Sequence, residues 1–277
     1  MHPVRKIILL KILRVKFSAA LFTILFSAVI LSFGNNKGRK YLEGLGFHYI
    51  PAGVVYSDSG EVSVRGFYMY EAEITNGQYA EFLQYLKKHD RQADLQMAGI
   101  HNGNWETALS FENTYAADYH TDPAFVDYPV VNITYEAAQL FCDYLQEMIR
   151  EKVPDAYVRL PDEIEWIHAA KGGKNDAEYP WENLGVNGKK EVEFCNYNSP
   201  DDGTCLATNL SRSYYPNAYG LYNMSGNVAE MLETKGRTKG GSWGSTAIQM
   251  RITAPDEYAG FDDASPFIGF RPVVILP

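Results

Sequence analysis

The pattern of hydrophobic and polar positions divides the chain into a long apolar stretch near its start and a body of mixed periodicity. Residues 17–33 contain no charged side chain, and five basic residues and no acidic one precede them: Arg5, Lys6, Lys11, Arg14 and Lys16. This is the arrangement of a signal peptide or a signal anchor. The apolar run is long for the core of a signal peptide and slightly short for a bilayer span, so both alternatives stay open. Basic residues ahead of the run predict that the N-terminus stays in the cytoplasm and that the body is exported. We therefore interpret residues 1–40 as a targeting segment with a basic linker, and residues 41–277 as a folded domain.

The body begins with a pattern of strands. Apolar and polar residues alternate over 47–75 between Gly and Pro residues, which predicts short strands and hairpins. A further strand is predicted at the end of the chain, in the sequence PVVILP. Residues 90–128 show no period and are rich in Asn, Asp, Gly and Tyr, so they predict a long irregular loop.

Three helices are predicted where a capping residue precedes apolar residues spaced by three and four positions. They begin after Thr75, Thr134 and Asp162, and the first and third carry a capping box. The apolar faces are Tyr79, Phe82, Leu83 and Leu86 in the first helix, Ala137, Phe141, Leu145 and Met148 in the second, and Trp166 and Ala169 in the third. Helices early in the chain and irregular strands late in it predict an α+β fold in a single irregular domain.

The charge of the chain excludes one class of partner. The formal net charge is −9, and basic residues are concentrated at the N-terminus. A nucleic-acid partner is therefore not expected, because a phosphate backbone requires a basic face. Acidic loops are better suited to divalent cations.

Three cysteines occur in the chain, an odd number for an exported protein. Cys195 and Cys205 lie in a turn-rich segment, where a local disulfide is one of two open alternatives in an oxidising compartment. Cys142 lies on the apolar face of the second predicted helix, which indicates a buried, inert thiol. No cysteine and histidine spacing typical of a zinc site is present.

Several motifs in fixed order carry a family resemblance. They are YEAEITNGQYAEFL, YPVVNITYEAAQLFCDYL, RLPDEIEWIHAAKGG, YPW, PNAYGLYNMSGNVAEM, KGGSW and IGFRPV. In this order they resemble the formylglycine-generating enzyme family, also called sulfatase-modifying factor domains. The resemblance runs from about Phe47 to the C-terminus, and it implies a variant of the C-type lectin fold.

The resemblance also implies structural calcium. The matching family positions bind the ion through the side chains of Asn223 and Glu230 and the carbonyls of Gly226 and Val228. Independently of the family, amide, carbonyl and carboxylate oxygens in one turn are the ligands that calcium prefers. The alternative is a turn in which these side chains cap neighbouring amides. A second implied site lies near Asn196 and Tyr197, with an acid from the Asp201–Asp202 loop.

The catalytic cysteine pair of the family is absent. In the family, two cysteines shortly after the GGS turn bind copper, whereas this chain has Ser245 and Met250 there. A hydroxyl and a thioether do not replace two thiolates, the ligands that monovalent copper requires. Formylglycine formation and copper binding are therefore not expected. Trp243, Ser245, Met250 and Tyr258 are the candidate lining of the remaining groove.

Three functions remain open from the sequence. The first is a non-enzymatic, calcium-stabilised binding or scaffold module at the cell envelope, with a protein or peptide partner, resembling components of gliding motility and type IX secretion. The second is a divergent metal-dependent oxidoreductase that uses the same groove. The third is a lectin-like carbohydrate receptor, although the chain contains no EPN sequence.

Overall fold

The computed structural model describes residues 37–277 except 58–59, 103–104, 106–107, 109–116, 182–193 and 200–206. The chain divides into two compact units, Met1–Leu45 and Gly46–Pro277. In the first unit, residues 37–44 are helical, where the sequence suggested a basic linker. An ion pair one helical turn apart, Arg39 Nε to Glu43 Oε1 at 2.8 Å, supports this helix.

The targeting segment lies outside the described residues. None of the helices that the structure describes is long and apolar enough to cross a bilayer. The signal peptide or anchor at 17–33 therefore stays a prediction.

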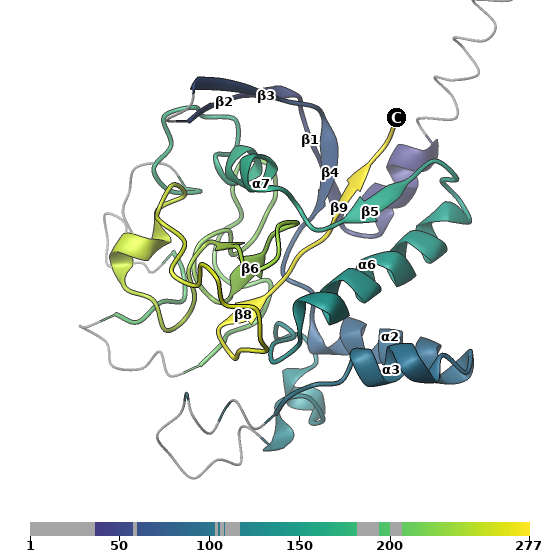
Figure 1. Ribbon diagram of the computed structural model, residues 1–277. Coiled ribbons are helices and arrows are strands. Elements are labelled where there is room, and N and C mark those ends of the chain that lie inside the picture. The colour runs from purple at the N-terminus through teal and green to yellow at the C-terminus, as the bar shows by residue number, and fades with distance from the viewer. Residues whose placement is uncertain are drawn as a thin grey trace, which may run out of the picture. The chain divides into compact units, whose positions relative to one another are not determined.

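The second unit is built on a four-stranded antiparallel sheet with the order β1-β4-β9-β5 (Figure 1). Its strands are β1 (Phe47–Ile50), β4 (Phe67–Tyr70), β5 (Tyr157–Arg159) and β9 (Val273–Ile275). Strands β2 (Gly53–Ser57) and β3 (Gly60–Val64) form a hairpin between β1 and β4 in the sequence. The predicted N-terminal strands and the closing strand are confirmed.

A smaller sheet completes the strand content of the C-terminal half. It has the order β7-β6-β8, from β6 (Ala229–Met231), β7 (Thr238–Lys239) and β8 (Ile268–Gly269). Strand β6 pairs with β7 in antiparallel and with β8 in parallel fashion. The short strands leave most of residues 207–267 in turns, which must be held by side-chain contacts.

The three long helices begin where their caps predict. Helix α2 (Asn76–Lys88) and α7 (Glu163–Ala170) each have a complete capping box, from Thr75 and Asp162 respectively. The side chain of Thr134 caps α6 (Tyr135–Arg150). Each cap accepts a hydrogen bond from an amide that has no partner within the helix.

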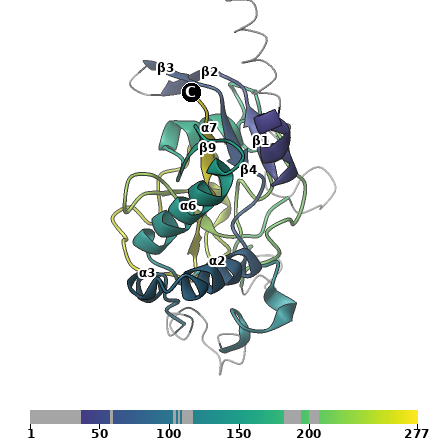
Figure 2. The same ribbon diagram turned by 90° about the vertical axis from the view of Figure 1, so that its right-hand side faces the viewer.

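The helices lie on both sides of the main sheet. Figures 1 and 2 show α6 with α2 on one side and α7 on the other. The apolar face of α2 meets α6 through stacked and edge-on rings of Tyr79, Phe82 and Phe141. On the other side, the fully buried Trp166 of α7 packs in a core with residues of β2, β3, β4 and β9.

Two expectations about the helices are corrected. The segment 90–128 is not wholly irregular, because it contains α3 (Gln92–Met97) and the short 3-10 helix η1 (Pro123–Phe125). Met148 is 39% exposed, and the neighbouring Ile149 is buried in its place. The buried stripe of α6 therefore ends one position later than the sequence pattern indicated.

Candidate functional site

The groove expected after the GGS turn contains a network of hydroxyl groups. Ser245 Oγ accepts a hydrogen bond from the Ser242 amide at 2.9 Å and donates to the carboxylate of Glu257. Ser242 Oγ lies 2.6 Å from the Tyr258 hydroxyl. Burial raises the pKa of Tyr258, so its hydroxyl stays protonated at neutral pH. These contacts bring Ser245 and Tyr258, two of the residues expected to line the groove, into one network.

Met250 lies in an apolar environment beside this network. It is fully buried and packs in a cluster with Tyr179, Cys195 and Tyr197. A Cβ added to Gly241 would approach the Met250 methyl group at 2.4 Å, so the thioether fills the space against the glycine turn. Among the described residues, this cluster holds one thiol, that of Cys195.

Trp243 is a packing residue more than an open binding surface. It is 5% exposed, its indole stacks on Phe267 at 4.4 Å between ring centroids, and its Nε1 donates to the Pro266 carbonyl. Tyr258 stacks on the same Phe267 ring. Of the four candidate groove residues, Trp243 and Tyr258 thus share one aromatic neighbour, and Met250 belongs to a separate cluster.

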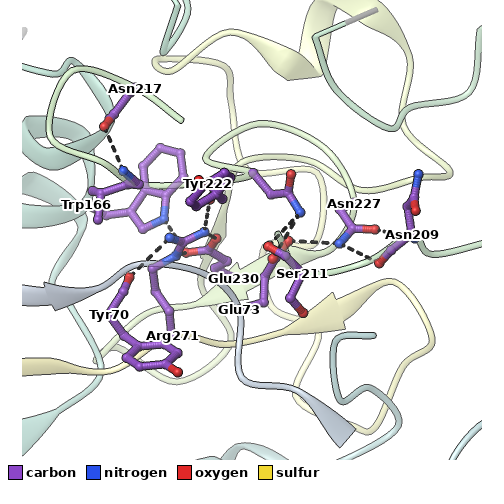
Figure 3. Close-up of polar contacts among 12 residues, drawn as sticks. Tyr70, Glu73, Trp166, Asn209, Ser211, Asn217, Tyr222, Asn227, Glu230 and Arg271 are labelled. Carbon is purple, nitrogen blue, oxygen red and sulfur yellow. Dashed lines mark hydrogen bonds and ion pairs between the residues drawn. The ribbon is translucent and has the colours of Figure 1, made fainter. Parts of the chain in front are cut away.

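Arg271 and Glu230 form an ion pair that is buried from solvent (Figure 3). Arg271 donates to both carboxylate oxygens of Glu230, with Nε to Oε2 at 2.7 Å and Nη2 to Oε1 at 2.6 Å. Trp166 Nε1 donates to the same carboxylate at 2.8 Å. Two further guanidinium hydrogens go to the carbonyls of Tyr70, from Nη1, and Tyr222, from Nη2. One cluster thereby joins β4, α7, β6 and the residue two positions before β9.

A second buried carboxylate, Glu73, lies close to this pair. Its oxygens accept hydrogen bonds from the side-chain amides of Asn223 at 3.2 Å and Asn227 at 3.1 Å. Burial raises the pKa of Glu73 to about 8, and the field of Glu230 adds to this rise, while Arg271 opposes it. The Arg271 guanidinium is thus the cation near both Glu73 and Glu230, and its hydrogen bonds go to Glu230.

The calcium set expected in the 223–230 turn does not fit these contacts well. Both oxygens of Glu230 already accept from a guanidinium, and one also accepts from an indole, so the carboxylate has a cation without a metal. Asn223 Nδ2 lies about equally near Glu73 Oε2 and the carbonyls of Leu210 and Ser211. Gly226 and Val228 belong to the same turn, with the Gly226 amide donating to the Gly240 carbonyl. Calcium binding by this segment therefore stays a prediction, and Glu230 is better explained as a structural ion-pair partner.

The second expected calcium site is only partly within the described residues. Asn196 and Tyr197 are buried, while Asp201 and Asp202 lie outside the described part. The side-chain amide of Asn196 donates to the Ala207 carbonyl and to Asn227 Oδ1. The backbone carbonyl of Asn196 accepts a hydrogen bond from the backbone amide of Asn227. These contacts join the two turns that carry the expected calcium ligands.

The expected disulfide is not tested, because Cys205 lies outside the described residues. Cys195 is buried, and burial of Cys142 raises the pKa of its thiol, which keeps it protonated and unreactive. Across the described part of the chain, no three His, Cys, Asp or Glu side chains come together as a metal-binding group.

Glu73 and Arg271 were not among the site residues expected from the sequence. Arg271 stands between Phe270 and the apolar closing strand, and Glu73 stands between Ala72 and Ile74, all of them buried. A charged residue inside an apolar run is costly unless it is paired, so such an acid and such a base are a signal for a buried ion pair. The sequence alone does not reveal that Glu230 takes Arg271 as its partner.

Comparison with known proteins places this geometry in a family. The family model of the sulfatase-modifying factor enzyme 1-like domain matches residues 39–275. The formylglycine-generating enzyme of Thermomonospora curvata is 34% identical over 110 residues, 38% of this chain and 32% of that protein. The enzyme of Bos taurus is 25% identical over 201 residues, 61% of this chain and 49% of that protein. Bos taurus inactive C-alpha-formylglycine-generating enzyme 2 is 28% identical over 162 residues, 53% and 50% of the two chains.

The matches thus span about a third to a half of the length of these curated relatives. Two solved structures share the fold over most of both chains. CarF has a TM-score of 0.58 and 20% identity, covering 83% of this chain and 98% of that one. PvdO from Pseudomonas aeruginosa has a TM-score of 0.58 and 18% identity, covering 82% and 93%. With a family model that matches nearly the whole of the second unit, the chain belongs to the sulfatase-modifying factor enzyme 1-like family, whose named relatives include formylglycine-generating enzymes.

Proposed function

We propose that this chain is a family member that does not form formylglycine and that acts as a binding or scaffold module at the cell envelope. The observation that carries the proposal is the set of contacts that Ser245 and Met250 make. The Ser245 hydroxyl is held by Ser242 and Glu257, and the Met250 thioether is buried in an apolar cluster. Neither group is a thiolate, which a monovalent copper centre requires. A relative in Bos taurus bears the name of an inactive enzyme, which supports the same interpretation.

A direct oxidation assay tests this proposal. The full chain is incubated with copper, oxygen and a cysteine-containing peptide, with the Thermomonospora curvata enzyme as the positive control. We expect no loss of the peptide thiol above a protein-free blank, because the described groove offers no thiol pair. Oxidation of the peptide at a rate comparable with that of the control enzyme would disprove the proposal.

One observation favours a second candidate, a divergent oxidoreductase. Cys195 packs in the same cluster as Met250, so one thiol and one thioether are neighbours beside the hydroxyl network. Thioether and thiolate together are ligands for soft metals. Elemental analysis of the purified chain separates the two candidates. Stoichiometric copper or iron that is lost in Cys195→Ser supports the oxidoreductase, and absence of both metals supports the binding module.

Calcium and export belong to the same proposal. The turn with Asn223 and Gly226 is the part of the chain that is expected to bind calcium, and the apolar segment 17–33 is expected to direct export and attach the domain to the membrane. Calcium titration monitored by thermal unfolding tests calcium binding, with an expected rise in Tm.

Protease digestion of intact cells tests export, and protection of the domain in intact cells would contradict it.

A further inference from the structure

A cavity of about 310 Å³ lies outside the hydroxyl network. One wall comes from the segment that links β4 to α2, and the other comes from residues 210–212, more than a hundred positions later in the sequence. Its lining residues are Tyr70, Ala72, Glu73, Thr75, Gln78, Asp127, Leu210, Ser211 and Arg212. At roughly 30 Å³ per water molecule, this volume equals about ten waters, so the cavity has room for an organic group.

Two buried oxygen-bearing side chains line this cavity. Glu73 has no exposed surface, and Ser211 is 1% exposed. The hydroxyl of Ser211 finds no hydrogen-bond partner among the residues that the structure describes. Figure 3 shows Ser211 next to Glu73. A buried hydroxyl without a partner costs stability, which indicates that a ligand or water supplies the missing contact.

Glu73 has room for another donor. The amides of Asn223 and Asn227 each take one of its oxygens, at 3.2 and 3.1 Å. A carboxylate offers about four lone-pair sites, and a backbone amide takes a third one, so about one remains. Both amides are neutral, and Arg271 gives its short contacts to Glu230. The carboxylate therefore lacks a cation in direct contact within the described structure.

The charges around the opening favour a cation. Arg212, the only basic residue that lines the cavity in the described structure, forms an ion pair with Glu71. Asp127, which also lines the cavity, is exposed and acidic. With Arg212 paired with Glu71, the carboxylate of Asp127 gives the lining a negative charge, and Glu73 adds a second one when the pH exceeds its pKa of about 8. A ligand with several N–H donors and a positive charge satisfies both Glu73 and Ser211.

We propose that this cavity binds a protonated primary amine, with Glu73 as its counter-ion and Ser211 as a second acceptor. An ammonium group has three donors and no acceptor, which suits a carboxylate and a hydroxyl oxygen together. Ala72, Leu210 and the ring of Tyr70 offer apolar surface for the alkyl stem. The amine belongs to a small free molecule or to a lysine side chain of a peptide. The inference rests on the proposed binding role and names the chemistry of the ligand.

Calorimetric titration of the full chain in mild detergent with n-butylamine tests the inference, at about pH 9, where Glu73 with its pKa of about 8 is ionised and an alkylamine with a pKa of roughly 10.4 is still protonated. We expect saturable binding, with 1-butanol, which has the same stem without the charge, binding at least about tenfold more weakly because it loses a charge-assisted contact. A titration with Nα-acetyl-lysine methylamide distinguishes the sources. Tighter binding of this compound than of butylamine supports a lysine in a peptide, and equal binding supports a small free amine.

Two cavity variants and one control locate the site. Glu73→Gln keeps the shape and removes the charge, and it should weaken butylamine binding about tenfold or more. Ser211→Ala should weaken binding about two- to fivefold and should fold normally, because its hydroxyl makes no hydrogen bond within the described structure. Glu81→Gln changes an exposed acid of α2 that does not line the cavity, so binding should be unchanged.

Three outcomes would overturn the inference. The first is equal binding of butylamine and butanol. The second is unchanged amine binding in both Glu73→Gln and Ser211→Ala. The third is binding of calcium chloride that depends on Glu73 without any amine binding, which would assign the cavity to a metal ion. If Glu73→Gln does not fold, Ser211→Ala decides alone. None of these outcomes changes the peptide oxidation result, so failure of the amine site and failure of the proposed function remain distinguishable.

Discussion

At the scale of single residues, Arg271 and Glu230 form an ion pair that is almost completely removed from solvent, with side chains 0% and 1% exposed. Removing two charges from water is costly, and the cost is offset only if every polar atom finds a partner. Here the two carbonyls and the indole of Trp166 complete the set. The pair therefore fixes which segments meet, and loss of one partner leaves an uncompensated charge.

The first prediction concerns this pair. Arg271→Met should lower the free energy of unfolding by about 3–5 kcal/mol, because Glu230 is left buried without its cation. Urea denaturation measures the change. Arg251→Met is the matched control, since the Arg251 side chain is 48% exposed and ion pairs exposed to solvent, such as the one it forms with Glu178, contribute little to stability. Equal losses in the two variants would contradict the prediction.

The second prediction concerns His120 and pH. Burial lowers the pKa of His120 to about 4 from the usual 6.5. Nδ1 lies 2.8 Å from Asn76 Oδ1, and the buried Nε2 finds no partner among the described residues. Between pH 6.5 and 4 the unfolded chain therefore binds a proton that the folded chain does not. The stability is full above pH 6.5 and falls as the pH drops through this window, by up to about 3 kcal/mol.

Urea denaturation at a series of pH values measures this effect. His120→Gln keeps a donor for Asn76 and cannot be protonated, so its stability should fall less steeply than that of the wild type between pH 6.5 and 4. Other groups titrate in both proteins, and the difference between the two curves isolates His120. Identical slopes would show that the folded protein binds the proton as readily as the unfolded chain.

The residue types of the candidate site were predictable, but their partners were not. The expectation that Ser245 and Met250 stand where the family has its cysteine pair rests on the family resemblance of the sequence alone. Glu230, in contrast, was expected to bind calcium, and it contacts a guanidinium 41 positions later in the chain. The sequence states which functional group a residue carries. Which opposite charge neutralises a buried charged group depends on which segments the fold brings together.

At the scale of helices and strands, the caps carry most of the predictable information. A capping box is formed within four consecutive residues, so the sequence reveals it without knowledge of the fold. Helix α3 was missed because its six residues bury no side chain and its N-cap, Arg91, makes no side-chain cap hydrogen bond. In α6 the expected Ala137, Phe141 and Cys142 are buried, but near the end of the helix Ile149 is buried in place of Met148, since the helical repeat of about 3.6 residues is not a whole number.

The third prediction tests a cap. Asp162 Oδ1 accepts a hydrogen bond from the Glu165 amide at 2.7 Å at the start of α7. Asp162→Ala should lower the free energy of unfolding by about 1 kcal/mol, because that amide loses its partner. Asp162→Asn retains an accepting oxygen and should stay within a few tenths of a kcal/mol of wild type. Thermal and urea unfolding measure both variants, and an alanine variant as stable as the asparagine variant would exclude the capping role.

At the scale of the whole second unit, turns far apart in sequence are held in direct contact. Gly226 has a φ of +80°, and a Cβ added there would lie 2.4 Å from the Asn196 carbonyl oxygen. The Asn227 amide donates to that same carbonyl. The two turns thus meet through their backbones, with no space for a side chain. Sequence periodicity does not predict such a contact, because neither turn has a repeat.

The fourth prediction uses this contact. Gly226→Ala should lower the free energy of unfolding by more than about 3 kcal/mol, from backbone strain of about 1–2 kcal/mol and from the displaced Asn196 carbonyl. Gly260→Ala is the matched control, with a φ of +84° and no atom within 4 Å of the added Cβ. Its loss should be limited to the strain, about 1–2 kcal/mol. Similar losses in the two variants, measured by urea denaturation, would show that the turns are not in tight contact.

The position of β9 has a consequence for how the domain forms during synthesis. Strands β4 and β5 are joined only through β9, whose Val274 pairs with Tyr68 and Val158. The guanidinium that neutralises Glu230 stands 201 positions after the Tyr70 carbonyl that it contacts. A nascent chain on the ribosome therefore has two open strand edges and an unneutralised acid until residues 271–275 emerge. Contacts between such distant segments form slowly, so closure of the sheet waits for synthesis of this segment.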